Sequence, residues 1–375
     1  MRTNNVLGIL YSNAYDGALP EMTGQRTMGS VPFGGRYRLI DFPLSSMVNA
    51  GISKVGVITK TNYRSLLDHL GMGKPWDLAR KHESLVILPP FVGAGTGGNQ
   101  TRLAGLRSAR DFLKNSKEEY VIMSDCNVVC SLDYRALLER HFASSADLTI
   151  ACREGAAPKI DSLRLRLGDG GRVTGVRLSS GSAGMRGDMP AEDALHALNI
   201  FVLRKALLER LIREAGEDDT DYGFFRRSVS NLRAHAARIT GYARVIDGLQ
   251  SYYDVNLDLL GSDNRASLFD PARPVLTKVQ DDMPTIYGLN SDVKNCLVAD
   301  GCQLRGKAEG CVIFRNVIIE EGAVARGCVL MQGTYVSADA SLTHVITDKS
   351  VVIKPGKALM GAANYPVYLG KQIVI

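Results

Sequence analysis

The C-terminal part of the chain carries an aliphatic residue at every sixth position. The stride is unbroken through Val312, Ile318, Val324, Leu330, Val336 and Leu342. Val298 and Leu304 continue it upstream after an offset of two residues. Hexapeptide periodicity is typical of a β-helix, in which each hexad supplies one short strand with its aliphatic side chain pointing inward. The period predicts a left-handed β-helix over residues 286–375. A sandwich of hairpins would instead show a period of two, with turns about every 8–12 residues.

The first 260 residues alternate strand-like with helix-like segments. Apolar runs of strand length occur at 54–60, 120–125, 147–153 and 196–203, and apolar residues at helical spacing occur at 63–70, 102–114 and 134–142. This alternation predicts a Rossmann-like, mostly parallel sheet domain over residues 1–260, with helices on both faces. Residues 261–285 are rich in proline and polar side chains, without a clear period, and are expected to form a linker.

Composition and charge exclude several classes of protein. No run approaches about 18 apolar residues and no signal peptide is recognisable, so we expect a cytoplasmic protein. The seven cysteines lack paired CxxC spacing, which argues against a zinc site or a redox motif. The net charge of +6 is modest for 375 residues, and no Lys/Arg block is interleaved with aromatic residues. Neither nucleic acid nor membrane is an expected partner, whereas anionic small molecules are.

The segment "NAYDGA", residues 13–18, follows the first apolar run of the chain. Ligands of such α/β domains bind beyond the carboxyl ends of the strands, so this loop stands where a phosphate loop would be. It contains one glycine and an aspartate, and it has no basic residue. Side chains therefore occupy positions where bare backbone would have to approach a triphosphate.

Residues 30–59, "SVPFGGRYRLIDFPLSSMVNAGISKVGVIT", resemble the bacterial glucose-1-phosphate adenylyltransferases, which carry a similar Val-x-Phe-Gly-Gly-x-x-Arg-Ile-Ile-Asp-Phe segment. The short motifs at 132–134, 221–223 and 256–260 and the hexad region follow in the order of that family. The resemblance implies a nucleotidyltransferase (GT-A-like) fold for the first domain. It also implies a Mg²⁺-dependent reaction in which glucose 1-phosphate attacks the α-phosphate of ATP, giving ADP-glucose and pyrophosphate for glycogen synthesis.

The resemblance also locates the family's catalytic groups, and this chain has replaced them. The arginine that faces the leaving pyrophosphate falls on Ala18, the two metal-binding aspartates fall on Asn127 and Val245, and the lysine that grips the sugar phosphate falls on Ser179, within 178–180. The nucleotide-contact segment falls on 101–103. Asp125 and Asp247 lie two residues from the metal positions, on the same side of a strand, and remain open as alternative metal ligands.

An intact scaffold without its catalytic set is similar to the GlgD-type subunits, the non-catalytic members of this family. That resemblance implies a regulatory subunit that binds no cofactor itself and modulates a catalytic partner, which uses Mg²⁺. It also implies a hetero-oligomer, which we expect to be a tetramer. Two alternatives are an active sugar-1-phosphate nucleotidyltransferase and a hexapeptide-repeat acyltransferase. The second would need a basic histidine, for which His344 is the candidate in the hexad region.

Three arginines, Arg26, Arg36 and Arg38, lie beside the "PFGG" motif. In the family, allosteric sugar-phosphate effectors bind near the corresponding segment, between the two domains. A guanidinium group can bind phosphate through two parallel hydrogen bonds. We therefore expect these arginines at an effector site or a subunit contact, although the family's effector-binding lysine falls on Met28.

Overall fold

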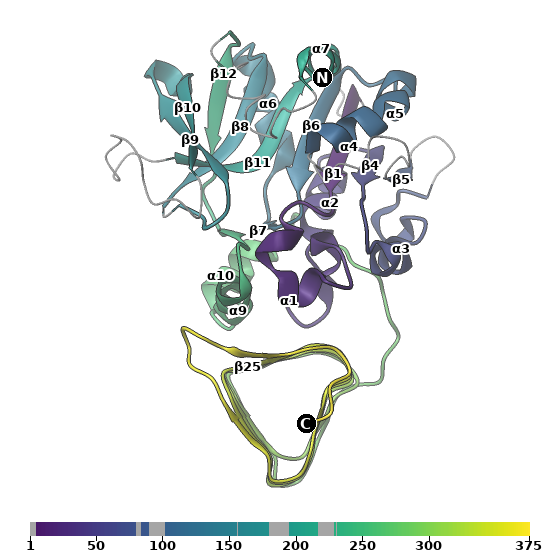
Figure 1. Ribbon diagram of the computed structural model, residues 1–375, viewed down its shortest axis with the longest axis vertical. Helices are drawn as coiled ribbons and strands as arrows, with labels where there is room; N and C mark the ends of the chain where they lie inside the picture. Colours follow the sequence, from purple (N-terminus) through teal and green to yellow (C-terminus); the bar gives the residue numbers. More distant parts are fainter. Residues whose placement is uncertain are drawn as a thin grey trace.

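The computed structural model describes residues 5–79, 84–89, 102–155, 157–179, 195–216, 229 and 231–375. A sheet domain with helices on both faces sits above a triangular β-helix, which Figure 1 shows from its end. None of the helices in the described part of the chain is long and apolar enough to cross a membrane. The motif at 221–223 lies outside the described residues.

The central sheet has nine strands. They are β1 (Val6–Tyr11), β4 (Val55–Ile58), β5 (Leu85–Leu88), β6 (Tyr120–Asp125), β8 (Leu148–Glu154), β9 (Ser162–Leu167), β10 (Val173–Ser179), β11 (Leu195–Arg204) and β12 (Ala234–Arg238). The main path runs β10-β9-β11-β6-β1-β4-β5, with β8 paired to β11 and β12. The pairs from β6 to β5 are parallel, as predicted, whereas β11 is antiparallel to β6, β8 and β9. The hairpin of β9 and β10 adds a further antiparallel pair.

Helices cover both faces of this sheet. One face carries α4 (Arg102–Ser108), α5 (Arg110–Asn115) and α7 (Lys205–Glu214), and the other carries α2 (Asp41–Asn49), α3 (Arg64–Leu70) and α6 (Tyr134–Ala143). Strand β1 is buried along its whole length. Leu7 and Ile9 pack into the first core and Val6 and Leu10 into the second, because successive side chains of a strand point to opposite faces.

The C-terminal domain is a prism of three parallel five-stranded sheets, which confirms the predicted β-helix. The first sheet contains β14 (Ile286–Tyr287), β17 (Gln303–Leu304), β20 (Ile318–Ile319), β23 (Tyr335–Val336) and β26 (Val352–Ile353). The second contains β15 (Asp292–Lys294), β18 (Lys307–Glu309), β21 (Val324–Arg326), β24 (Ser341–Thr343) and β27 (Ala358–Met360). The third contains β16 (Leu297–Val298), β19 (Val312–Ile313), β22 (Val329–Leu330), β25 (Val345–Thr347) and β28 (Val367–Leu369).

The register of the β-helix differs from the expected stride at three positions. Leu330, Val336 and Leu342 point into the prism as predicted, and upstream Leu304 does so too. At the earlier strands the interior residues are Ile313, Ile319 and Ala325, one position after Val312, Ile318 and Val324. The cause is the length of a coil: Ile313 pairs with Leu330, 17 residues on, whereas three full hexads would need 18. The interior stride therefore shortens to five residues between Ala325 and Leu330.

A shared apolar core joins the two domains. Val312 and Val329 point out of the prism and pack against Tyr252 and Tyr253 of helix α9 (Leu249–Asp258). The glycines of "PFGG" form the turn between β2 (Pro32–Phe33) and β3 (Tyr37–Arg38). Gly35 has φ 84°, and a Cβ there would lie 3.7 Å from Ala299 of the β-helix, so glycine suits both the left-handed turn and the close approach.

The segment predicted as a linker is more ordered than its composition indicated. It contains helix α10 (Ser262–Leu268) and then an extended stretch that docks on the sheet domain. The Thr277 hydroxyl donates to Asp41 Oδ2 at 2.6 Å, and Lys278 Nζ donates to the carbonyl of Asp68 at 2.7 Å. Side-chain hydrogen bonds therefore fix the path of this segment between the two domains. Because such contacts give the sequence no regular spacing of apolar residues, the composition did not indicate this order.

The corrected register predicts opposite outcomes for two aspartate substitutions. Leu330→Asp places an unpaired charge in the dry interior and should lower the free energy of unfolding by more than about 3 kcal/mol. Val324→Asp, on the outward side of β21 and in register with exposed Lys307, should cost less than about 1 kcal/mol. Urea denaturation of both variants measures the difference, and equal losses would contradict the assigned register.

Candidate functional site

The carboxyl ends of β1 and β6 lie side by side in the sheet, with Tyr11 in register with Asp125. Together with the loop 12–18, these strand ends are called the ligand edge below. Within the loop, Asn13 Nδ2 donates to Asp16 Oδ2 at 2.6 Å, and the Met28 backbone N–H donates to Asp16 Oδ1 at 2.7 Å. Asn13 Oδ1 in turn accepts from the backbone N–H of Lys60 at 2.8 Å. The loop is thus held by its own side chains.

Asp16 opposes anion binding at this loop. Burial raises the pKa of its carboxyl to about 6, so at neutral pH it is mainly ionised. The carboxylate takes the Met28 N–H and the Asn13 amide, which are donors of the kind that a phosphate group would need. A negative charge at this place repels a triphosphate, which agrees with the interpretation of the loop from sequence.

The two positions to which the resemblance assigns the metal-binding aspartates, Asn127 and Val245, lie close together. Val245 lies on β13 (Ala243–Val245) and pairs with Val128 of β7 (Val128–Cys130). The next residue, Ile246, donates its backbone N–H to the Asn127 carbonyl at 2.8 Å and accepts from Asn127 Nδ2 at 3.2 Å. Asn127 is fully buried, so at this spot the chain presents one amide and one aliphatic side chain, and no charge.

Both alternative aspartates have partners within the chain. Asp125 is nearly fully buried and pairs with Arg102: Arg102 Nε donates to Asp125 Oδ1 at 2.9 Å, and a terminal guanidinium nitrogen contacts Oδ2. Asp247 accepts the backbone N–H of Lys159 at 2.7 Å through Oδ2. The described residues contain no group of three or more His, Cys, Asp or Glu side chains that could hold a metal ion.

The remaining predicted catalytic positions carry no charge. The carbonyl of Ala18 lies 3.8 Å from where a Cβ on Gly248 would be, which places it close to the turn after β13. Ser179 ends β10, in register with Ser162 of β9. Thr101 and Ser180, from the predicted nucleotide and sugar segments, lie outside the described residues.

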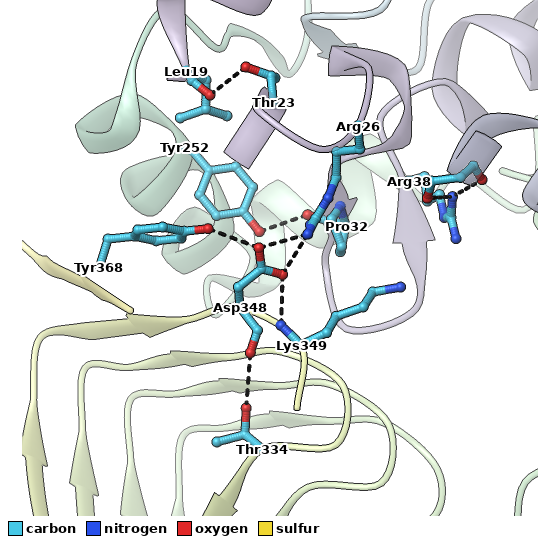
Figure 2. Close-up of polar contacts among 11 residues, drawn as sticks. Leu19, Thr23, Arg26, Pro32, Arg38, Tyr252, Thr334, Asp348, Lys349 and Tyr368 are labelled. Atoms are coloured by element: carbon cyan, nitrogen blue, oxygen red, sulfur yellow. Dashed lines mark hydrogen bonds and ion pairs between the residues drawn. The ribbon is translucent and has the colours of Figure 1, made fainter. Parts of the chain in front are cut away.

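The arginines beside "PFGG" separate into two roles. Arg26 points from the sheet domain into the β-helix, where one guanidinium nitrogen contacts both oxygens of Asp348 at 2.9 and 2.7 Å (Figure 2). Their side chains are only 6% and 3% exposed. The Tyr368 hydroxyl and the Lys349 backbone N–H also donate to Asp348, at 2.8 and 2.7 Å. Arg26 is therefore committed to a buried ion pair that ties the two domains.

Arg36 and Arg38, in contrast, line a pocket of about 210 Å³ between the domains. Three further cations line it, namely Lys278 of the linker and Arg315 and Lys349 of the β-helix, whereas Asp68 is the one carboxylate in the lining. Burial, aided by the nearby charges of Arg38 and Arg26, lowers the pKa of Lys349 to about 8. Such a cluster suits an anion. Sequence reasoning missed these three residues because they come from separate segments with no local motif.

His344 is occupied at the domain interface. Its Nδ1 lies 2.7 Å from the oxygen of the Tyr253 hydroxyl, and that hydroxyl donates its hydrogen to the Gly327 carbonyl at 2.6 Å. The backbone of His344 is in the left-handed region, with φ 51°. A histidine held by a tyrosine between two packed domains serves packing, so the geometry does not favour the acyltransferase alternative.

Comparisons with known proteins agree with this architecture. The family described as "Nucleotidyl transferase" matches residues 19–159, and "GlmU-like, C-terminal hexapeptide" matches residues 284–363. The glycogen biosynthesis protein GlgD of Bacillus subtilis (strain 168) is 33% identical over 378 residues, covering 100% of this chain and 98% of the relative. The chain belongs to the family of GlgD proteins and glucose-1-phosphate adenylyltransferases.

Two other relatives show how the family divides. The glycogen biosynthesis protein GlgD of Geobacillus stearothermophilus is 33% identical over 331 residues, covering 86% of this chain and 83% of that protein. A glucose-1-phosphate adenylyltransferase of Fervidobacterium nodosum is 28% identical over 361 residues, covering 94% of this chain and 85% of that enzyme. The chain is thus similar both to GlgD proteins and to the named enzymes.

The buried ion pair predicts a large difference between two arginine variants. Arg26→Ala leaves Asp348 charged and buried without its cation, which should cost about 3–5 kcal/mol of unfolding free energy. Arg36→Ala removes an exposed side chain and should change stability by less than about 0.5 kcal/mol. Thermal and urea denaturation measure both effects, and an unchanged Arg26→Ala protein would show that the pair does not hold the domains.

Proposed function

We propose that the chain is a glycogen-biosynthesis subunit of glucose-1-phosphate adenylyltransferase with a degenerate catalytic site. In this proposal it modulates a catalytic partner that makes ADP-glucose from ATP and glucose 1-phosphate. The observation that carries it is the retention of the family fold with Ala18, Asn127, Ser179 and Val245 at the positions of the catalytic groups. The names of the GlgD relatives support the pathway.

The chemistry of the ligand edge supports the degenerate site. Transfer of a nucleotidyl group depends on positioning and on neutralising phosphate charge with metal ions, arginine and lysine. At the ligand edge Arg102 is bound to Asp125, and Asp16 adds negative charge. We infer that this chain holds no cofactor of its own and that the Mg²⁺ of the reaction belongs to the partner.

A partner surface is available at the start of the β-helix. Strands β14, β15 and β16 are the outermost strands of the three sheets at this end, as far as the described residues show. On or beside them lie large apolar side chains that are between 54% and 101% exposed: Met283, Ile286, Tyr287 and Leu289. An exposed apolar patch beside free strand edges is typical of an interaction site. We assign it to the catalytic subunit, in a hetero-oligomer that we expect to be a tetramer.

The interdomain pocket supports an effector that carries phosphate. Arg36, Arg38 and Lys349 approach it from both domains, so a bound anion would contact the sheet domain and the β-helix together. A ligand shifts a conformational equilibrium only through differential contacts with two states. A pocket formed by two domains can provide them, and we infer that a sugar phosphate is the effector class.

Activity measurements test the proposal directly. A metal ion contributes several kcal/mol of transition-state stabilisation, so the isolated chain should form ADP-glucose at least about a thousandfold more slowly than a catalytic relative. Added to a catalytic subunit, it should change substrate saturation or activation by roughly 5–150-fold, the range of a typical coupling energy. Turnover within tenfold of the catalytic relative, or identical kinetics with and without the chain, would refute the proposal.

The assigned surface predicts the effect of a charge. Met283→Lys and Leu289→Lys, at exposed positions, should leave the melting temperature unchanged while weakening association with the catalytic subunit at least about tenfold, because each would desolvate a lysine in an apolar contact. Exposed Met72→Lys, on the sheet domain, is the matched control. Sedimentation velocity of the mixture measures the fraction of chain bound to the catalytic subunit. Equal association of all variants would place the interface elsewhere.

The pocket predicts a pH-dependent affinity for sulfate, a probe whose charge is constant in this range. As the pH rises from 7 through the pKa of Lys349 near 8, this side chain loses its charge, so sulfate should bind roughly five- to tenfold more weakly at pH 9. Arg38, with a pKa lowered to about 10, stays charged at pH 9. Lys349→Met should bind sulfate weakly at both pH values. Titration calorimetry measures these affinities, and the same pH dependence in Lys349→Met would contradict the assignment.

A further inference from the structure

The pair of Arg102 and Asp125 occupies the centre of the ligand edge. Asp125 ends β6, and Arg102 begins α4 and lies within 101–103, the segment that counting assigns to nucleotide contact. The side chains are 14% and 1% exposed. A carboxylate buried to this degree is strongly destabilised unless a cation or several hydrogen-bond donors compensate it. A guanidinium group from the same chain provides that compensation here, at a place where a carboxylate could otherwise bind a divalent cation.

Tyr15 extends this pair across the ligand edge. The Arg102 guanidinium carbon lies 4.9 Å from the centre of the Tyr15 ring, within the range of a cation–π contact. The Tyr15 hydroxyl accepts from Asn199 Nδ2 at 2.9 Å and donates to the carbonyl of Asp161 at 2.9 Å. Asn199 belongs to β11 and Asp161 precedes β9. One tyrosine therefore connects the loop after β1 with the antiparallel half of the sheet.

We propose that Tyr15, Arg102, Asp125 and Asn199, together called the arginine latch, act as an internal substitute for nucleotide and metal. The guanidinium neutralises the carboxylate, and the tyrosine ring stacks on the guanidinium from the loop side. The latch holds the loop against both halves of the sheet with no ligand bound. This inference rests on the proposed function, because the latched conformation is the state that the catalytic partner would sense.

A permanent latch has a consequence for coupling. A subunit that opens and closes with its ligand transmits that equilibrium, whereas a subunit fixed in one state biases its partner constantly. The four residues come from the loop, α4, β6 and β11, so one contact set fixes elements on both sides of the ligand edge. Tyr15 and Arg102 are positioning residues in this account, and neither touches a reacting group.

Hydrogen exchange of the full-length chain tests the latch itself. The double variant Arg102→Ala with Asp125→Asn removes both charges and leaves no unpaired ion. Amides of residues 12–19 should exchange at least about tenfold faster in it than in the wild type, because the loop loses the contact of Tyr15 with Arg102. Arg110→Ala, an exposed arginine that begins the neighbouring helix, is the matched control and should not change this rate. Unchanged exchange in the double variant would overturn the inference.

A milder variant covers the case in which the double variant does not fold. Tyr15→Phe keeps the ring against Arg102 and removes only the hydroxyl contacts with Asn199 and Asp161. It should speed exchange of the same amides by roughly threefold, a smaller effect, since the contact of the ring with Arg102 remains. Exchange at the wild-type rate in Tyr15→Phe would equally overturn the latch.

Kinetics of the mixed complex test whether the partner senses the latch. The double variant should bind the catalytic subunit within about threefold of wild-type affinity, because the latch lies in the sheet domain and the assigned contact lies on the β-helix. It should lose at least about threefold of the activation that the wild-type chain gives. Full activation by a complex that contains the double variant would overturn the inference. Failure of the wild-type chain to form any complex would instead overturn the proposed function, and the exchange result would still decide on the latch.

Discussion

A buried ion pair between Arg26 and Asp348 determines how the two domains lie. Asp348 satisfies its charge with this arginine, the Tyr368 hydroxyl and the Lys349 N–H, and it would be costly to bury without them. The pair fixes the segment before "PFGG" against the last coils of the β-helix. The apolar core around Tyr252 and Val312 can then close, and the cationic pocket forms between the same surfaces.

Charge also explains the difference between the two candidate sites. At the ligand edge Asp125 is paired with Arg102, and Asp16 keeps a negative charge that accepts hydrogen bonds from Asn13 and Met28. Among the described residues that line the interdomain pocket, Asp68 is the one carboxylate. Arg315 is paired with Asp282, but Arg36, Arg38 and Lys349 still leave an excess of positive charge that favours an anion. This contrast supports the proposal that the chain senses an anion and modulates a partner.

Local patterns predicted the fold well, because an aliphatic residue must return to the prism interior on every strand and helices must cover a parallel sheet. The register was less predictable, since a coil of 17 residues shortens one hexad and Val312 packs on the other domain. Counting from motifs assigned Asn127 and Val245 to the metal positions, and the structure places these two residues close together, which leaves the assignment a prediction. Lys349 and the contact of Arg102 with Asp125 left no local signal, since tertiary packing alone unites residues from distant segments.

Binding of Mg·ATP to the isolated full-length chain tests most directly whether the ligand edge has lost its nucleotide chemistry. Equilibrium dialysis with labelled ATP and Mg²⁺, with a catalytic relative measured in parallel, should show no saturable binding to this chain up to about 1 mM ATP, a concentration that corresponds to roughly 4 kcal/mol of binding free energy. Saturable binding of one ATP per chain with a dissociation constant below about 100 μM would contradict the account.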